Sequence, residues 1–163
     1  GFQGILSVSI IKIQNRMSQP IKLSIPSHPK YLGLIRKVLQ EFLDYHEVPD
    51  ETARRLILCV DEACSNVIKH GYGGPCEEPI EATFHIDGDD FKVQIRDYGK
   101  QCDSSQIKPR CLDQIKPGGL GTHFINEIMD DVSYCTERAK GTLLTMAKKL
   151  KNELTSTQEK NKE

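Results

Sequence analysis

Three polar side chains recur four residues apart in one stretch of the chain, ETARRLILCVDEACSNVIKHGYGG at residues 51–74. They are Glu62, Asn66 and His70. In a helix, residues spaced in this way lie on one ridge, so a carboxylate, an amide and an imidazole share an edge. The stretch then ends in the glycine-rich segment GYGG. A solvated helix edge is the ordinary explanation of such a ridge, and a functional site is the alternative.

Two motifs further along the chain could complete a site with this ridge. Asp97-Tyr98-Gly99 follows an alternating run, although Asp-x-Gly alone usually marks a turn. PGGLG, at residues 117–121, opens a helical pattern. Its glycines give a permissive backbone and free N–H groups at the positive end of a helix, which suits phosphate. A glycine hinge is the alternative for this fragment.

The patterns around these motifs predict the elements that position them. Residues 20–25 alternate as a strand, and residues 31–46 carry apolar side chains at helical spacing. Asp50 is the expected N-cap of a second helix. That helix should bury the apolar side chains of Ala53, Leu56, Ile57, Val60, Ala63 and Val67. The polar ridge should therefore border the core without belonging to it.

The second half of the chain predicts two hairpins with a long loop and a helix between them. The expected elements are strands at 80–87 and 91–97, a lid-like loop at 98–118, a helix at 120–129, and strands at 132–138 and 142–149. This order predicts an α+β two-layer sandwich, with a mixed, mostly antiparallel sheet and helices on one face.

Composition and charge argue against several classes of protein. The 163 residues suggest one domain, and a net charge of −1 argues against direct nucleic-acid binding. No apolar run reaches the roughly 18 residues of a membrane helix, and the N-terminal apolar segment makes a poor signal peptide. Six cysteines without CxxC pairs are expected to be reduced thiols in a cytoplasmic protein.

Three segments are expected along the chain. Residues 1–16 precede Met17 and form an N-terminal extension or a remnant of cloning, with weak alternation that could add a strand. Residues 17–150 form the folded domain. Residues 151–163 are a polar C-terminal tail, expected to be a solvated helix end that runs into disorder.

The motifs, in this order and spacing, resemble the Bergerat ATP-binding fold of gyrase, heat-shock chaperones, histidine kinases and mismatch-repair ATPases. The closer resemblance is to the serine-kinase anti-sigma factors. VDEACSNVIKHGYGG resembles their Glu-Ala-x-x-Asn-x-x-x-His-Gly-Tyr helix, and IRDYGKQCD their Asp-x-Gly loop. PGGLGTHFINEIMDDVSY resembles their Gly-Gly-Leu-Gly helix, and GTLLTMAKKL their final strand. The likeness spans about residues 20–150.

The resemblance implies a role for each motif in an ATP-binding kinase domain at residues 17–150. Asn66 would coordinate Mg²⁺, which also holds ATP phosphate oxygens, and Glu62 would be the general base for the acceptor hydroxyl. Asp97 would accept a hydrogen bond from the adenine amino group. His70 is expected to be a buried, hydrogen-bonded histidine, and a structural or phosphate-side role is the alternative.

The remaining implied contacts surround the nucleotide. Gly99 would let the adenine ring approach the backbone, and Thr142 would reinforce adenine binding. Gly119, Leu120 and Gly121 would wrap the phosphates. The chain departs from many superfamily members at Gln101, where they have a second glycine. The basic residues of the lid, Lys108, Arg110 and Lys116, are either phosphate contacts or solvated loop charges.

The resemblance further implies a kinase that is also a binding switch. It would phosphorylate a serine or threonine of an anti-anti-sigma (STAS-type) partner, sequester a sigma factor, and form a homodimer. The alternative is a catalytically weak nucleotide-binding regulatory module. A sensor histidine kinase fragment ranks lower, because only His28 and His46 precede Glu62 and neither lies on a two-helix phosphoacceptor module. An ATPase that moves a large machine would need a transducer domain.

Overall fold

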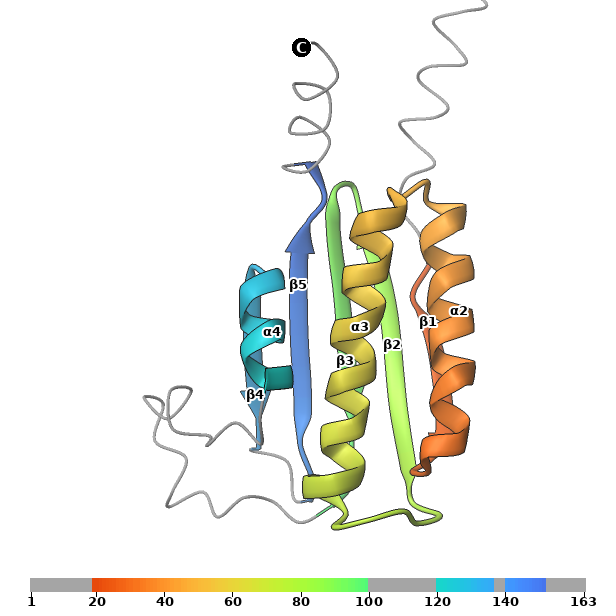
Figure 1. Cartoon of the computed structure of the whole chain (residues 1–163), viewed down its shortest axis with the longest axis vertical. Helices are drawn as coiled ribbons and strands as arrows, with labels where there is room; N and C mark the ends of the chain where they lie inside the picture. Colours follow the sequence, from red (N-terminus) through yellow and green to blue (C-terminus); the bar gives the residue numbers. More distant parts are fainter. Residues whose placement is uncertain (1–18, 100–119, 137–139, 152–163) are drawn as a thin grey trace, which may run out of the picture.

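The computed structural model describes residues 19–99, 120–136 and 140–151, and every structural statement below concerns these residues. The elements follow one another along the chain as strands and helices of ordinary length (Figure 1). They are β1 (Ile21–Pro26), the 3₁₀ turn η1 (Pro29–Tyr31), α2 (Leu32–Tyr45), α3 (Asp50–Asn66), the π turn η2 (Val67–Gly71), β2 (Pro79–Asp87), β3 (Asp90–Arg96), α4 (Leu120–Ile128), β4 (Asp131–Cys135) and β5 (Leu143–Lys149).

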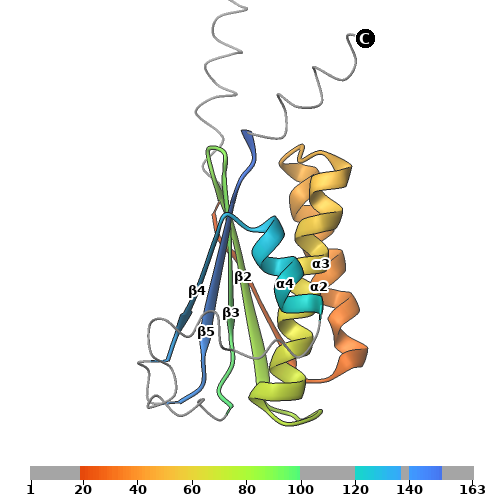
Figure 2. The same cartoon turned by 60° about the vertical axis from the view of Figure 1, so that its left-hand side comes forward.

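The strands form one sheet in the order β1-β2-β3-β5-β4. Every pairing among the described strands is antiparallel. Helices α2, α3 and α4 all cover the same face of this sheet (Figure 2). The predicted α+β two-layer sandwich is therefore confirmed, with an antiparallel sheet in the described part of the chain where a mixed one was expected.

Side-chain alternation along the strands explains this layering. Ile80, Ala82, Phe84 and Ile86 of β2 are buried, while the residues between them are only half-buried. A period of two places one set of side chains on the helix face and the other on the open face. The helices complete the core with a stripe from α2 that includes Leu39 and Leu43. Burial of these apolar side chains is the main force that holds the two layers together.

Helix α3 runs along the centre of the helical layer. It buries Ala53, Leu56, Val60 and Ala63 as predicted, whereas Ile57 is only half-buried. The N-cap is Pro49 and not Asp50, which lies inside the first turn of the helix. The Asp50 carboxylate still favours the helix there, because it lies near the positive end of the helix dipole.

The cysteines of the described residues are free thiols, as the sequence predicted. Cys59 and Cys64 pack in the core on α3, and Cys76 and Cys135 are half-buried. Burial raises the pKa of each core thiol to about 12. Both therefore serve as small apolar side chains of the core.

The predicted hairpin between β2 and β3 is confirmed with a tighter turn. Asp87 pairs with Asp90, so Gly88 and Asp89 alone form the turn. Gly88 has a φ of 60°, a left-handed conformation that glycine adopts without strain. Strand β4 ends at Cys135, earlier than the predicted residue 138. Residues 137–139 lie outside the described part of the chain.

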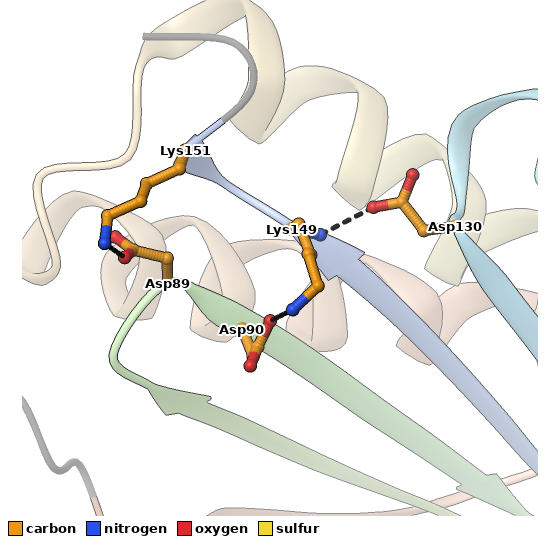
Figure 3. A network of polar contacts seen from close by, with 5 residues as sticks. All are labelled: Asp89, Asp90, Asp130, Lys149 and Lys151. Atoms are coloured by element: carbon orange, nitrogen blue, oxygen red, sulfur yellow. Dashed lines mark hydrogen bonds and ion pairs between the residues drawn. The ribbon is translucent and has the colours of Figure 1, made fainter.

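A polar network ties this turn to the end of β5 (Figure 3). The Lys149 Nζ lies 2.7 Å from Asp90 Oδ1, and the Lys151 Nζ lies 2.7 Å from Asp89 Oδ2. The backbone N–H of Lys149 donates to Asp130 Oδ2 over 2.7 Å. The network joins the turn, the start of β3 and the residue before β4 to the end of β5 and to Lys151 just beyond it.

Three sequence predictions fall outside the described residues: the added strand in residues 1–16, the lid at 100–118 and the polar tail from residue 152. Among the described residues, no helix has both the length and the apolar character needed to cross a bilayer.

Candidate functional site

Asp97 occupies the position directly after β3 and is 5% exposed. Its Oδ1 accepts a 3.0 Å hydrogen bond from the N–H of Gly99. Its own backbone N–H donates to the carbonyl of Thr142 over 3.0 Å. Thr142 precedes β5 directly, so the two residues lie side by side at one end of the sheet. The structure therefore brings Asp97, Gly99 and Thr142 to one place, and their predicted contacts with adenine stay predictions.

The Asp97 carboxylate is held in a partly desolvated position. Burial raises its pKa, while the N–H groups of Gly99 and Thr142 and the charge of Arg96 act in the opposite direction. A carboxylate so placed is a strong, fixed hydrogen-bond acceptor, since few water molecules compete for it. Such a group can recognise a ligand that presents an N–H donor.

Three glycines bring three backbone segments against Asp97. A Cβ on Gly99 would overlap the carbonyl of Gly71, and a Cβ on Gly141 would overlap the backbone of Asp97. A Cβ on Gly71 would lie 3.4 Å from Asp97 Oδ1. Gly141 also has a φ of 77°, which disfavours other residues. Glycine at these three positions therefore lets the backbone pack closely around the Asp97 carboxylate, which a side chain at Gly99 or Gly141 would prevent.

The polar ridge lies at this end of the sheet, because helix α3 ends there. Glu62 and Asn66 are both half-buried in its last turns. Asn66 ends the α-helix, and the π turn η2 follows at once, closed by a 3.0 Å hydrogen bond from the Tyr72 N–H to the Val67 carbonyl. The last residue of that turn, Gly71, has its carbonyl packed against Gly99 and lies close to the Asp97 carboxylate. The end of α3 therefore lies beside the end of β3 (Figure 1).

His70 departs from the prediction. It is exposed, so it is not a buried, hydrogen-bonded histidine. The physical reason is the π turn, which carries more residues per turn than an α-helix and moves position 70 off the ridge. The ridge therefore has two members, Glu62 and Asn66. A π turn at the end of a helix is a frequent feature of functional sites.

The glycine motif lies only partly within the described residues. Helix α4 begins at Leu120, so Leu120 and Gly121 are in its first turn, and the helix packs beside α3. Gly119 lies outside the described residues, as do Gln101 and the basic lid residues. The predicted phosphate contacts of this motif stay predictions.

The donor set limits which metal could bind here. The described residues contain no cluster of three or more His, Cys, Asp or Glu side chains. A cage made only of protein ligands is therefore absent from this part of the chain. One amide oxygen, from Asn66, fits Mg²⁺, which commonly keeps several waters and binds phosphate oxygens.

Tyr72 is a site residue to which sequence reasoning gave no role. Its hydroxyl donates to the carbonyl of Pro79 over 2.7 Å and accepts from the N–H of Tyr98 over 2.9 Å. The only signal in the sequence was its place after His70-Gly71 in the motif that also contains Asn66. Gly71 and Gly141 were missed as well, because their closeness to Asp97 depends on tertiary packing.

One protein family and several known proteins are similar to this chain in sequence. The sequence profile of the family described as the histidine kinase-like ATPase domain matches residues 25–148. A curated relative from Bacillus velezensis, serine-protein kinase RsbW, is 28% identical and covers 82% of this chain and 87% of its own. The protein of the same name from Bacillus subtilis is 29% identical with the same coverage. The serine-kinase resemblance is confirmed by these relatives.

Solved structures share the fold at low identity. A chain in the SiaB–SiaC complex from Pseudomonas aeruginosa aligns with a TM-score of 0.62 at 12% identity, over 90% of this chain and 98% of that one. A Mycobacterium tuberculosis protein with RsbU and RsbW domains gives 0.59 at 14% identity, over 82% of this chain and 32% of that one. With the family profile spanning residues 25–148 and the Asp97 site at the end of the sheet, the chain belongs to the histidine kinase-like ATPase family.

Proposed function

We propose that this protein is an ATP-dependent protein-serine/threonine kinase that acts on a small anti-anti-sigma (STAS-type) partner and sequesters a sigma factor in the cytoplasm. The closeness of Gly71 to Asp97 carries the proposal, because it places the end of the helix that holds Glu62 and Asn66 beside the buried carboxylate that would accept from adenine. The curated serine-protein kinases at 28–29% identity support the same activity. We assign the kinase domain to residues 17–150.

Each residue has one task in the proposed reaction. Asp97 accepts a hydrogen bond from the adenine amino group, and Gly99, whose missing side chain leaves the backbone bare, admits the ring. Thr142 lies beside Asp97 and supports the same contact. Gly119, Leu120 and Gly121 enclose the phosphates with backbone N–H groups at the start of α4.

The transfer step needs a base for the acceptor hydroxyl and a positive charge beside the ATP phosphates. Glu62 removes the proton from the partner's serine or threonine hydroxyl as that oxygen bonds to the γ-phosphorus of ATP. The bond from the γ-phosphorus to the bridging oxygen breaks, and ADP leaves with the electron pair. Mg²⁺, held by Asn66, would neutralise phosphate charge. Glu62 and Asn66 must therefore share one helix edge, as their half-buried positions on α3 allow.

A pair of variants tests this assignment of roles. Glu62→Gln is expected to keep ATP affinity and to slow phosphate transfer by about 10²–10⁴-fold, the usual contribution of a general base. Asn66→Ala is expected to lose Mg²⁺-dependent ATP binding. Transfer is measured with labelled ATP and an anti-anti-sigma partner, and binding by calorimetry with ATP and Mg²⁺.

Two controls match these changes on the same helical layer. Glu51→Gln alters an exposed glutamate in the first turn of α3, and Gln40→Ala alters an amide on α2. Both should leave transfer and ATP binding unchanged. Absence of transfer by the wild-type chain, with intact ATP binding, would refute the kinase and leave a nucleotide-binding regulatory module. Sedimentation of the protein with a sigma factor tests sequestration. The mass of the sedimenting species also shows whether the protein is the expected homodimer.

A further inference from the structure

The hydroxyl of Tyr72 bridges two backbone groups that lie far apart in the sequence. It donates to the Pro79 carbonyl over 2.7 Å and accepts from the Tyr98 N–H over 2.9 Å. Tyr72 follows Gly71, the last residue of the π turn, and Tyr98 follows Asp97. One oxygen atom therefore connects the end of the α3 segment to the peptide next to the Asp97 carboxylate.

The Tyr72 hydroxyl completes a set of three consecutive hydrogen bonds. The N–H of Asp97 donates to Thr142, the N–H of Tyr98 to Tyr72, and the N–H of Gly99 to the Asp97 carboxylate. The first acceptor belongs to the residue before β5, and the third is local. Only the second acceptor comes from the segment that follows α3, so among these three hydrogen bonds it is the one that ties the Asp97 peptide to the end of that helix, beside the close approach of Gly71 and Gly99.

The chemistry of the purine ring makes that position important. Adenine presents an amino donor at its 6-position, where guanine presents a carbonyl oxygen. Guanine nevertheless carries donors at N1 and at its 2-amino group, so a carboxylate free to shift could bind it as well. A site prefers adenine only when the carboxylate is fixed opposite the 6-amino group, because specificity requires hydrogen-bonding groups at set positions.

We infer that Tyr72 is a positioning residue that determines the preference for ATP over GTP. Through its hydroxyl, Tyr72 keeps Asp97 at a fixed position relative to the end of α3. This inference rests on the proposed function, in which Asp97 accepts from adenine. Tyr72 does not touch the nucleotide in this scheme and acts only through Asp97. Burial also raises the pKa of the Tyr72 phenol, so it stays protonated near neutral pH and can donate and accept together.

Tyr98 offers a comparison residue with a similar hydroxyl contact and a different role. Its hydroxyl donates to Glu81 Oε2 over 3.0 Å, and its ring lies 4.5 Å from the Arg96 guanidinium. Both partners belong to strands, Glu81 to β2 and Arg96 to β3, so this contact does not involve the helical layer. Removing the Tyr98 hydroxyl leaves its backbone N–H bonded to Tyr72.

Three tyrosine-to-phenylalanine variants test the inference. Tyr72→Phe is expected to lower the ratio of ATP to GTP affinity by about tenfold, mainly through weaker ATP binding, because the hydrogen bonds of the hydroxyl to Pro79 and from Tyr98 are both lost. Tyr98→Phe should lower the melting temperature without changing that ratio. Tyr45→Phe, at an 84% exposed position on α2, should change neither. Calorimetry with each nucleotide and Mg²⁺ gives the affinities.

The outcomes separate the inference from the proposed function. An equal loss of preference in Tyr72→Phe and Tyr98→Phe, or an unchanged ratio in Tyr72→Phe, would overturn the inference alone. A wild-type chain that binds neither nucleotide would overturn the proposed function and this inference with it. Hydrogen exchange of the wild-type chain adds a reading that does not depend on any variant. The Tyr98 amide should exchange as slowly as that of Asp97, and exchange at the solvent rate would contradict the bridge.

Discussion

Gly99 and Gly71 approach so closely that a side chain on Gly99 would occupy the position of the Gly71 carbonyl. Gly71 closes the π turn after Asn66, and Gly99 follows Asp97 by two residues. The contact is therefore the point at which the helical layer meets the end of the sheet. Any change that separates these two residues should separate the two halves of the site.

Gly99→Ala tests this contact directly. The added methyl group would force the two backbones apart, and overpacking of this kind typically costs about 1–3 kcal/mol of unfolding free energy. ATP affinity should fall as well, because Asp97 would move with Gly99. Urea unfolding and nucleotide calorimetry measure the two effects.

Gly33→Ala is the matched control for that variant. A Cβ on Gly33, within α2, would make an ordinary 3.5 Å contact with the side chain of Arg36. Alanine in a helix is more favourable than glycine by roughly 0.5–1 kcal/mol, so this variant should be slightly more stable and should bind ATP normally. A Gly99→Ala protein as stable as Gly33→Ala would show that the close approach is not required.

Asp97→Asn should change how stability depends on pH. Burial raises the pKa of folded Asp97 above its ordinary value of 3.8, so the folded state binds this proton more tightly than the unfolded state. The stability contributed by the proton is present in full below the unfolded pKa and is lost as pH rises through the folded pKa. The wild-type stability minus that of Asp97→Asn should therefore fall with rising pH in a window that begins near pH 3.8.

Urea unfolding at a series of pH values gives that difference. At neutral pH the asparagine variant should be at least as stable as the wild type, yet it should bind ATP more weakly, since a site can lose stability to serve its function. A difference that rises with pH would mean that hydrogen bonds to the carboxylate outweigh its burial.

The core thiols should resist alkylation in the folded protein. Burial raises the pKa of Cys59 and Cys64 to about 12, and both side chains are fully buried, so almost no thiolate forms at pH 8. Half-buried Cys76 and Cys135 provide the internal comparison. Iodoacetamide followed by peptide mass spectrometry should label the core pair only after unfolding. Labelling of either core thiol at the rate of Cys76 would contradict the packing of α3.

The network at the far end of the sheet should depend more on Asp130 than on Lys149. Asp130→Ala removes the acceptor of the Lys149 N–H together with a 3.7 Å ion pair to Lys148, and should cost about 1 kcal/mol, mostly from the hydrogen bond. Lys149→Met removes only an exposed ion pair with Asp90 and should leave the melting temperature unchanged, because solvent and salt screen such pairs. Thermal unfolding at low and high salt distinguishes the two contributions.

Much of the fold could be predicted because its signals are local. The period of two in residues 80–87 fixed the buried face of β2, and the helical period fixed that of α3. The β2–β3 turn was visible in Gly88-Asp89 for the same reason. Asp97 and Gly99 could be placed at a strand end because the alternating run before them stopped there.

The rest depends on contacts between distant residues. The Tyr72 hydroxyl bonds to the N–H of a residue 26 positions away, and no local pattern encodes that pair. The π turn was invisible too, because the sequence of Val67–Gly71 suits an ordinary helix end, and the wrong prediction for His70 followed. Roles for Glu62 and Asn66 came from resemblance alone and stay predictions.

The antiparallel course of β3 and β5 has a practical consequence for biophysical work. Arg96 pairs with Leu143 at one end of the two strands, and Asp90 pairs with Lys149 at the other. The strands place these ends about 20 Å apart, since six steps of roughly 3.3 Å separate Leu143 from Lys149. A fluorescent dye attached at Lys149 would therefore report on domain tumbling and on docking of a second protein without entering the nucleotide region, which makes it a suitable handle for anisotropy titrations.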